Sequence, residues 1–220
     1  TGMKQWRYLS SILDFYAHDQ AQAYVQSFGF FRNGEKARLF TPERLEHITT
    51  SRGDSITKAL FDQSSSLDDV ERLMFTDIHS YLPDDLLAKT DIAAMAHALE
   101  VRSPLLDHVF METVARMPSS FKLAGRTSKA LLKEIARDYI PAEIIDKPKR
   151  GFAIPGEQWL RTSLKGYMRE QLLDPAFLQY GFERPFIERL LESHERGEDA
   201  SRKLWSLLML RLWLKGWFEG

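Results

Sequence analysis

The sequence predicts an all-helical fold, and three observations support that prediction. Apolar residues recur at spacings of three and four along most of the 220 residues, which is the period of an amphipathic helix. Valine occurs only five times and no segment alternates apolar and polar residues for long, so strands have almost no signal. Prolines and glycines separate the periodic segments, and the spacing predicts about eight to ten helices.

The N-terminal half begins with a long predicted helix. Apolar residues recur over residues 6–28 before Gly29 ends the pattern. Further along, Ser66 and Asp69 resemble a capping box at the start of a helix that Pro83 ends. The other helices predicted in this half start at Pro42 or cover residues 54–61, 84–98 and 105–117.

The C-terminal half combines helices with one informative loop. A hydroxyl at Thr127 or Ser128 is predicted to cap a helix that Pro141 closes. Residues 146–156 contain two prolines and two glycines and have no helical period, so we expect a loop there. The remaining helices are predicted over residues 157–173, 175–180, 185–196 and 201–217.

The composition is that of a folded, soluble chain. With 44% hydrophobic residues, a length of 220 supports one domain, or one large domain with an appendage. Thirty basic residues balance thirty-one acidic ones, so no overall field attracts the chain to nucleic acid or to an acidic membrane. The absence of cysteine excludes disulfides, thiolate metal sites and a cysteine nucleophile within this chain.

Neither end resembles an export or membrane signal. The N-terminus lacks the order of a signal peptide, and its start before Met3 indicates an engineered or cut end. The apolar segment 204–214 contains Arg211 and is followed by Lys215, well short of the ~20 apolar residues of a membrane span, so we expect a buried helix. A cytoplasmic location is the default expectation.

The segment 99–108, Leu-Glu-Val-Arg-Ser-Pro-Leu-Leu-Asp-His, gathers charge at a predicted helix entrance. Glu100, Arg102 and Asp107 surround Ser103-Pro104, where serine is a good N-cap and proline a good first helical residue. Two interpretations are open for the three charged side chains. They line a ligand pocket, or Arg102 pairs with a carboxylate and holds two helices together.

A second segment, Lys147-Pro-Lys-Arg-Gly-Phe152, has the composition of a polyphosphate-binding loop. Three cations fall within four residues, Pro148 restricts the backbone, and Gly151 permits close approach of a ligand. The alternative is a basic turn that simply faces water. The six histidines show no metal-ligand spacing, and the five tryptophans lie on apolar stripes typical of core packing.

Together with residues 77–107, these two segments resemble the synthetase domain of the glutamine-dependent asparagine synthase family. The resemblance runs from about residue 67 to 173 and is most specific between Asp77 and Phe152. It implies that the chain is an all-α fragment that completes an α/β adenine-nucleotide alpha-hydrolase-like synthetase domain in the intact protein. In that interpretation residues 1–66 are a helical lead-in, 67–173 carry the motifs and 174–220 are C-terminal helices.

The resemblance also implies a reaction. In the family, ATP activates the side-chain carboxylate of aspartate as an acyl-adenylate, pyrophosphate leaves, and ammonia derived from glutamine displaces AMP. The family's N-terminal cysteine nucleophile and two glycine-rich ATP-binding loops are absent from this sequence. We therefore expect one wall of the synthetase site, inactive by itself, with the upstream synthetase and glutaminase domains of the same chain as partners and a homodimer as a further option. ATP with Mg²⁺ is expected in the intact protein, with neither held tightly by the fragment.

By this resemblance Lys149 is the candidate catalytic residue, because it matches the family's loop lysine and the reaction needs a cation where charge develops on the phosphates. Further candidates for the ATP, pyrophosphate or adenylate pocket are Lys147, Arg150, Glu100, Arg102, Asp107, Asp84, Asp91 and Lys129. The spacing of seven puts Asp84 and Asp91 in phase on a helix, although exposed aspartates at helix starts are common. No metal site is predicted.

Two alternatives to an asparagine-forming ligase remain. One is a helical interaction module without catalytic activity. The other is a relative that amidates a sugar or a peptide, because Ser103 stands where many asparagine synthases carry an apolar residue.

Overall fold

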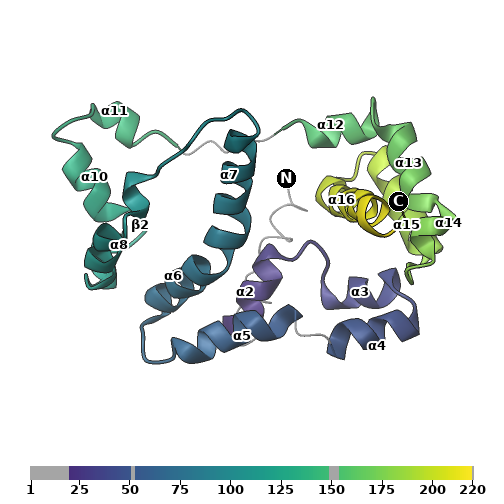
Figure 1. Ribbon diagram of the computed structural model, residues 1–220, viewed down its shortest axis with the longest axis horizontal. Helices are drawn as coiled ribbons and strands as arrows, with labels where there is room; N and C mark the ends of the chain where they lie inside the picture. The colour runs from purple at the N-terminus through teal and green to yellow at the C-terminus, as the bar shows by residue number, and fades with distance from the viewer. Residues whose placement is uncertain (1–19, 51–52, 149–153, 220) are drawn as a thin grey trace. The chain divides into compact units, whose positions relative to one another are not determined.

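A computed structural model describes residues 20–50, 53–148 and 154–219 (Figure 1). The described residues form two compact units: unit 1 is drawn from residues 1–54 and 151–220, and unit 2 from residues 55–150. Helices dominate both units, and a single two-stranded hairpin is the only sheet among the described residues. The predicted all-α fold of the fragment is confirmed.

Unit 1 joins helices from both ends of the chain. Its N-terminal part contains α2 (Gln20–Phe28), α3 (Asn33–Leu39) and α4 (Pro42–Thr50). Its C-terminal part contains α12 (Gly156–Arg161), α13 (Lys165–Leu173), α14 (Pro175–Leu178), α15 (Arg184–Glu195) and α16 (Ser201–Phe218). The two parts meet where Thr41 N–H donates to the carbonyl of Gly181 at 2.9 Å and Glu183 N–H donates to that of Leu39 at 2.8 Å.

Helix α16 lies at the centre of unit 1, in contact with α12, α13 and α15 (Figure 1). Its residues Leu204, Leu207 and Leu208 are buried in one core with apolar side chains of the neighbouring helices. Burial of aliphatic side chains is the main stabilising term in such a bundle. The other core side chains that solvent does not reach are Leu160, Met168, Leu172, Phe177, Ile187 and Leu191.

The predicted burial of the C-terminal helix is correct for its inner face only. Arg211 is buried, and its charge is matched by Asp174, 2.8 Å from Nη2, and by Glu219, 2.7 and 2.6 Å from Nη1. By contrast, Trp213 and Trp217 are 51% and 76% exposed, and Trp159 of α12 is exposed too, so the prediction that tryptophans pack in the core is wrong for these three. None of the described helices combines the length and apolar character needed to cross a membrane.

Unit 2 consists of short helices and turns. It contains most of α5 (Gly53–Gln63), then α6 (Asp69–His79), the π-helix η1 (Leu82–Leu87) and α7 (Ala88–Met95). After an extended segment come the 3₁₀-helix η2 (Pro104–Leu106), α8 (His108–Ala115) and α9 (Ser119–Lys122). The antiparallel hairpin β1 (Leu123–Ala124) and β2 (Thr127–Ser128) precedes α10 (Ala130–Ala136) and α11 (Ala142–Ile145).

Several predicted helix ends differ in the structure. Asp68, rather than Ser66, caps α6, because its carboxylate accepts the N–H of Glu71 at 2.9 Å. The helix ends at His79, and Pro83 stands in the first turn of η1, where a missing N–H is tolerated. Thr127 and Ser128 form β2 instead of a cap, and Lys129 precedes α10.

The structure also has more helices than the eight to ten predicted. Residues 157–173 form two helices that part at Thr162, and the described ranges contain fifteen α-helices from α2 to α16, several of them a single turn. The predicted loop at 146–156 agrees with the structure at Asp146 to Pro148 and Ile154 to Pro155, which are not helical, but Gly156 already begins α12. Residues 149–153 lie outside the described part.

Candidate functional site

The charged residues of the first segment lie on an extended stretch between α7 and η2. Arg102 Nε donates to Glu100 Oε1 at 2.6 Å, and the two side chains are 86% and 69% exposed. Arg102 thus pairs with a carboxylate, as one of the two interpretations expects, but this contact joins residues two positions apart and does not link two helices. Both groups remain open to a further ligand from the solvent side.

Asp107 marks the predicted helix entrance. Its Oδ1 accepts the N–H of Phe110 at 3.0 Å, which makes Asp107 the N-cap of α8. Ser103, the predicted cap, precedes only the 3₁₀-helix η2 and makes no capping hydrogen bond with its side chain. The carboxylate of Asp107 is therefore fixed by its own helix, with its second oxygen available.

Asp84 and Asp91 do not share one regular helix. Asp84 is in η1 and Asp91 is in the first turn of α7, and both are exposed. Because a π-helix has a wider turn than an α-helix, the seven-residue spacing no longer keeps the two aspartates in phase. Within the described residues no group of three His, Asp or Glu side chains could hold a metal ion.

The start of the basic segment is held by an ion pair that the sequence analysis missed. Arg137 donates from Nη1 and Nη2 to the two carboxylate oxygens of Asp146, at 3.1 Å each. The hydrogen bonds from Arg137 hold the pKa of Asp146 below its usual range, and the pKa of Arg137 is raised by the same contact. Lys147 follows Asp146 directly and is exposed, whereas Lys149 and Arg150 lie outside the described residues.

Helix α12 follows the basic segment in the sequence and packs within unit 1. Leu160 is completely buried in the core. Arg161 donates from Nε to the carbonyl of His194 at 2.9 Å and pairs through Nη1 with Glu157 at 2.7 Å. Asp146, which precedes the basic segment, is thus held within unit 2, and Leu160, in the helix that follows it, is held within unit 1.

Lys129 has an unusual backbone. Its φ of 58° and ψ of 38° place a non-glycine residue in the left-handed region, just before α10. Such a conformation is strained and persists where the surrounding structure imposes it. Lys129 lines a groove of about 550 Å³ whose other walls are mainly apolar.

The structure assembles the site candidates only in part. It joins Glu100 to Arg102 and places Lys147 beside the Asp146–Arg137 pair. Among the described residues, no hydrogen bond or ion pair connects these groups with Asp84, Asp91 or Lys129. The catalytic and pocket roles of all nine candidates stay predictions.

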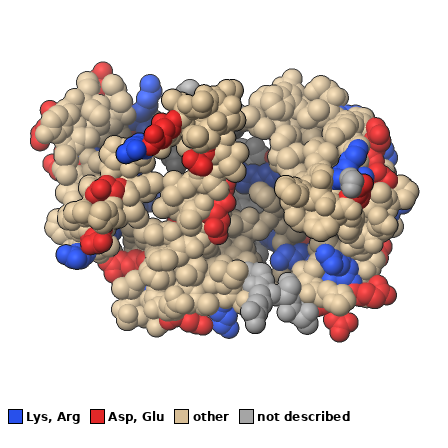
Figure 2. Space-filling model, in the orientation of Figure 1, with Lys and Arg blue, Asp and Glu red and all other residues tan. Residues whose placement is uncertain are grey.

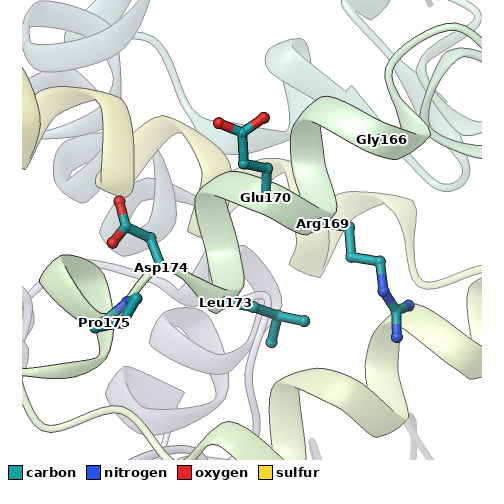
Figure 3. Close-up of a pocket in the computed structure, with 6 residues that line it drawn as sticks. All are labelled: Gly166, Arg169, Glu170, Leu173, Asp174 and Pro175. Carbon is teal, nitrogen blue, oxygen red and sulfur yellow. The ribbon is translucent and has the colours of Figure 1, made fainter.

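A second hollow, of about 580 Å³, lies in unit 1 along α13 and the start of α14 (Figure 3). In Figure 3 the side chains of Glu170 and Asp174 point to one side of α13 and that of Arg169 to the other. Arg169 pairs with Glu195 at 3.2 Å, and Asp174 accepts from Arg211 and from the N–H of Ala176. These charges stabilise the helices of unit 1, so this hollow is a poor candidate for chemistry.

Arg137 was not found by sequence reasoning, although a weak signal existed. It stands at the C-terminal end of α10, nine residues before Asp146, with a proline between them. A cation at a helix C-terminus commonly interacts with the helix dipole. From the sequence alone, that explanation was sufficient for Arg137, and the ion pair with Asp146 was not expected.

Comparison with known proteins places these elements in a family. The asparagine synthase family model matches residues 3–215. Asparagine synthetase [glutamine-hydrolyzing] 1 of Bacillus subtilis (strain 168) is 31% identical over 159 residues, which are 72% of this chain and 25% of that protein. Asparagine synthetase [glutamine-hydrolyzing] of Gallus gallus is 30% identical over 156 residues, 63% of this chain and 26% of that protein.

The family model covers nearly all of this chain, whereas the two relatives match 72% and 63% of it and only about a quarter of their own length. The chain spans about a quarter of the length of the curated relatives it matches. No solved structure matches it at a significant level. Since the family model covers almost every residue, the chain belongs to the asparagine synthase family.

Proposed function

We propose that this chain is part of an ATP-dependent ligase that adenylates a carboxylate and transfers ammonia to it, with release of pyrophosphate and AMP. The observation that carries the proposal is the family match over residues 3–215. Relatives named as glutamine-hydrolysing asparagine synthetases support aspartate as the acceptor and glutamine as the ammonia source. The product would then be asparagine.

In this proposal the basic segment stabilises the charge that develops on the phosphates. Lys149 is the catalytic cation, with Lys147 and Arg150 as auxiliaries, because preorganised cations contribute most where negative charge grows in the transition state. The fork between Arg137 and Asp146 supports this role. It occupies both oxygens of the carboxylate next to Lys147, so that carboxylate does not compete with the phosphates for the lysine.

The remaining candidates would line or brace the adenylate pocket: Glu100, Arg102, Asp107, Asp84, Asp91 and Lys129. Exposed Arg102 and Glu100 can reorient toward a ligand, whereas Asp107 is held as a helix cap. ATP would bring Mg²⁺ with it. The described carboxylates do not form a metal-binding group, so we derive no step through the ion.

The proposed partners are the upstream synthetase and glutaminase domains of a longer polypeptide, since the relatives are about four times the length matched here. A homodimer and a cytoplasmic location stay predictions.

The test uses Lys149→Ala in the longest natural protein that contains this chain, with ATP, aspartate and glutamine supplied. We expect pyrophosphate release to fall on the order of a hundredfold or more, by comparison with removal of one preorganised donor. Arg150→Ala should do less, because we expect a loop at this segment, and in an extended loop adjacent side chains would point in different directions. Glutamate production, which belongs to a separate domain, should persist.

Two outcomes would contradict the proposal. Undiminished pyrophosphate release in Lys149→Ala would reduce the basic segment to a solvated turn. An amide product other than asparagine, identified by mass spectrometry, would retain the ligase but replace aspartate with a sugar or peptide acceptor.

A further inference from the structure

Unit 1 contains a further hollow, of about 520 Å³, beside the start of α16. Its walls come from the segment after α2, from α12 with the residues just before it, and from the first two turns of α16. We call it the Trp205 hollow, after one of the residues that line it. Its volume lies in the range of sites that bind small molecules. No site candidate that the structure describes lines it.

The inner walls of the Trp205 hollow are apolar and belong to the core of unit 1. Leu160 of α12 is completely buried, and Trp205 packs partly buried against the core. Helices α12 and α16 are in contact with each other, so neither wall has to form when a ligand binds. Phe30 and Ile154, 48% and 58% exposed, make an outer apolar edge. Such walls suit the apolar part of a small ligand, and Phe30 and Trp205 suit an aromatic one.

Gly156 keeps part of the Trp205 hollow open. It is the first residue of α12, and among the described residues only side-chain atoms of Ile154 would lie near a Cβ there, at 3.8 and 3.9 Å. These are ordinary contacts, so the position accepts a side chain without strain. Because Gly156 and Ile154 both line the hollow, a larger side chain at this position would take up part of its volume.

The polar groups of the Trp205 hollow have intramolecular partners, with one exception. Glu157 pairs with Arg161 at 2.7 Å, and the hydroxyl of Ser201 donates to Asp199 at 2.6 Å. Arg202 is exposed, and the described part of the chain contains no ion pair or side-chain hydrogen bond of its guanidinium. On the face drawn in Figure 2, charged residues stand in small groups between larger uncharged areas. The described lining of the hollow thus presents an unmatched positive charge and no unmatched negative one.

This combination selects the charge of a ligand. A guanidinium binds a carboxylate through two parallel hydrogen bonds, which fixes the direction of the ligand as well as its charge. A polyphosphate would require several cations, and Arg202 is the only one in the described lining. A cationic ligand would require a free carboxylate, whereas Glu157 is already paired.

We propose that the Trp205 hollow binds a small aromatic monocarboxylate. Its carboxylate pairs with Arg202, and its aromatic body lies against Phe30, Ile154 and Trp205. This site goes beyond the proposed ligase reaction, because no described candidate for that reaction contributes to it.

The experiment compares the binding of phenylbutyrate, an aromatic monocarboxylate, with that of the neutral phenylbutanol. Equilibrium dialysis at neutral pH uses the longest natural protein that contains this chain, without ATP, aspartate or glutamine. Arg202→Gln removes the charge, and Arg189→Gln, at an exposed arginine of α15, is its control. Gly156→Leu fills part of the hollow. Its control is Gly34→Leu on α3, where nothing described lies within 4 Å of the missing Cβ.

We expect the unchanged protein to bind phenylbutyrate about tenfold or more tightly than phenylbutanol, because only the acid can form the charge-assisted pair. Arg202→Gln should reduce the affinity for the acid to that for the alcohol, and Arg202→Lys should retain part of the difference. Gly156→Leu should weaken the binding of both compounds. Arg189→Gln and Gly34→Leu should leave both affinities unchanged.

Three results would overturn the proposal. The first is no binding of phenylbutyrate, as expected if another part of the longer polypeptide fills the hollow. The second is binding that Arg202→Gln and Gly156→Leu leave unchanged, since the acid would then lie elsewhere. The third is equal affinity of the unchanged protein for the acid and the alcohol. Because no reactant of the ligase is present, these results are independent of whether Lys149 is catalytic.

Discussion

Arg137 and Asp146 form a two-pronged ion pair, with Nη1 bound to Oδ2 and Nη2 to Oδ1 at 3.1 Å. The pair lies at the point where α11 gives way to the basic segment. Its geometry is the planar match between guanidinium and carboxylate that lysine cannot reproduce. Arg137 also lies near a second carboxylate, because its Nε is 3.9 Å from Oε2 of Glu134.

This pair should make the region sensitive to acid. Because hydrogen bonds from Arg137 lower the pKa of Asp146 in the folded chain, the pair stabilises the fold above the ordinary pKa of aspartate. That contribution is lost as the pH falls through the lowered pKa. In Arg137→Gln we expect the pKa of Asp146 to rise toward its ordinary value, measured by NMR titration. High salt should shrink the difference, since both side chains are partly exposed. An unchanged pKa in Arg137→Gln would mean that the pair does not form in solution.

The core lies in unit 1, so two side-chain truncations in this 220-residue chain should change the free energy of unfolding by very different amounts. Leu172→Ala removes a completely buried side chain of unit 1 and should lower the free energy of unfolding by about 2 to 5 kcal/mol. Ile92→Ala removes a side chain that is 71% exposed and should change it by less than about 0.5 kcal/mol. Urea titration followed by circular dichroism measures both. A loss at Ile92 equal to that at Leu172 would place a core in unit 2.

Gly181 should be intolerant of a side chain. Its φ is +88°, and a Cβ there would lie 2.6 Å from Cβ of Arg44. Strain and contact together should make Gly181→Ala destabilising by about 1 to 3 kcal/mol in thermal or urea unfolding. Gly166 is the control, because it lies within α13 with nothing near its missing Cβ. Gly166→Ala should stabilise by about 0.5 to 1 kcal/mol. The same sign for both variants would refute the assigned backbone at Gly181.

Arg211 should contribute more to stability than Lys215, an exposed cation of the same helix. Replacement by methionine leaves Asp174 and Glu219 without their shared guanidinium. The midpoint of thermal unfolding should therefore fall in Arg211→Met, and by more than in Lys215→Met, where an exposed cation is removed. The pKa of Asp174 should rise only part of the way, because the N–H of Ala176 is the larger cause of its lowering and remains in place. Equal midpoints for the two variants would show that the ion pairs contribute no net stability.

Sequence periodicity predicted the helices with regular apolar spacing and missed α3, which lacks that spacing. The apolar spacing of residues 185–196 and 201–217 was enough to locate α15 and α16. Helix α3 has no such spacing. Its Glu35 accepts the N–H of Arg32 at 3.1 Å and forms an ion pair with Lys203. The local sequence contains no signal that predicts the contact with Lys203.

The candidate site was predictable as motifs but not as contacts. The two charged segments stand out in the sequence. Ser103 and Asp107 are both suitable N-cap residues, and the backbone conformation determines that Asp107 caps α8. Lys129 shows the same limit, since a left-handed lysine contradicts local preference and follows from the turn after the hairpin.

The contact between Glu35 and Lys203 joins residues 168 positions apart, so unit 1 cannot be completed until nearly the whole chain has been made. At about 5 to 20 residues per second, synthesis of the intervening chain takes roughly 10 to 30 s. During that interval the apolar side chain of Leu39 has no partner from α15 or α16. Helix α3 therefore cannot complete its packing until most of the chain has been synthesised. Its docking is a late step of folding in the cell.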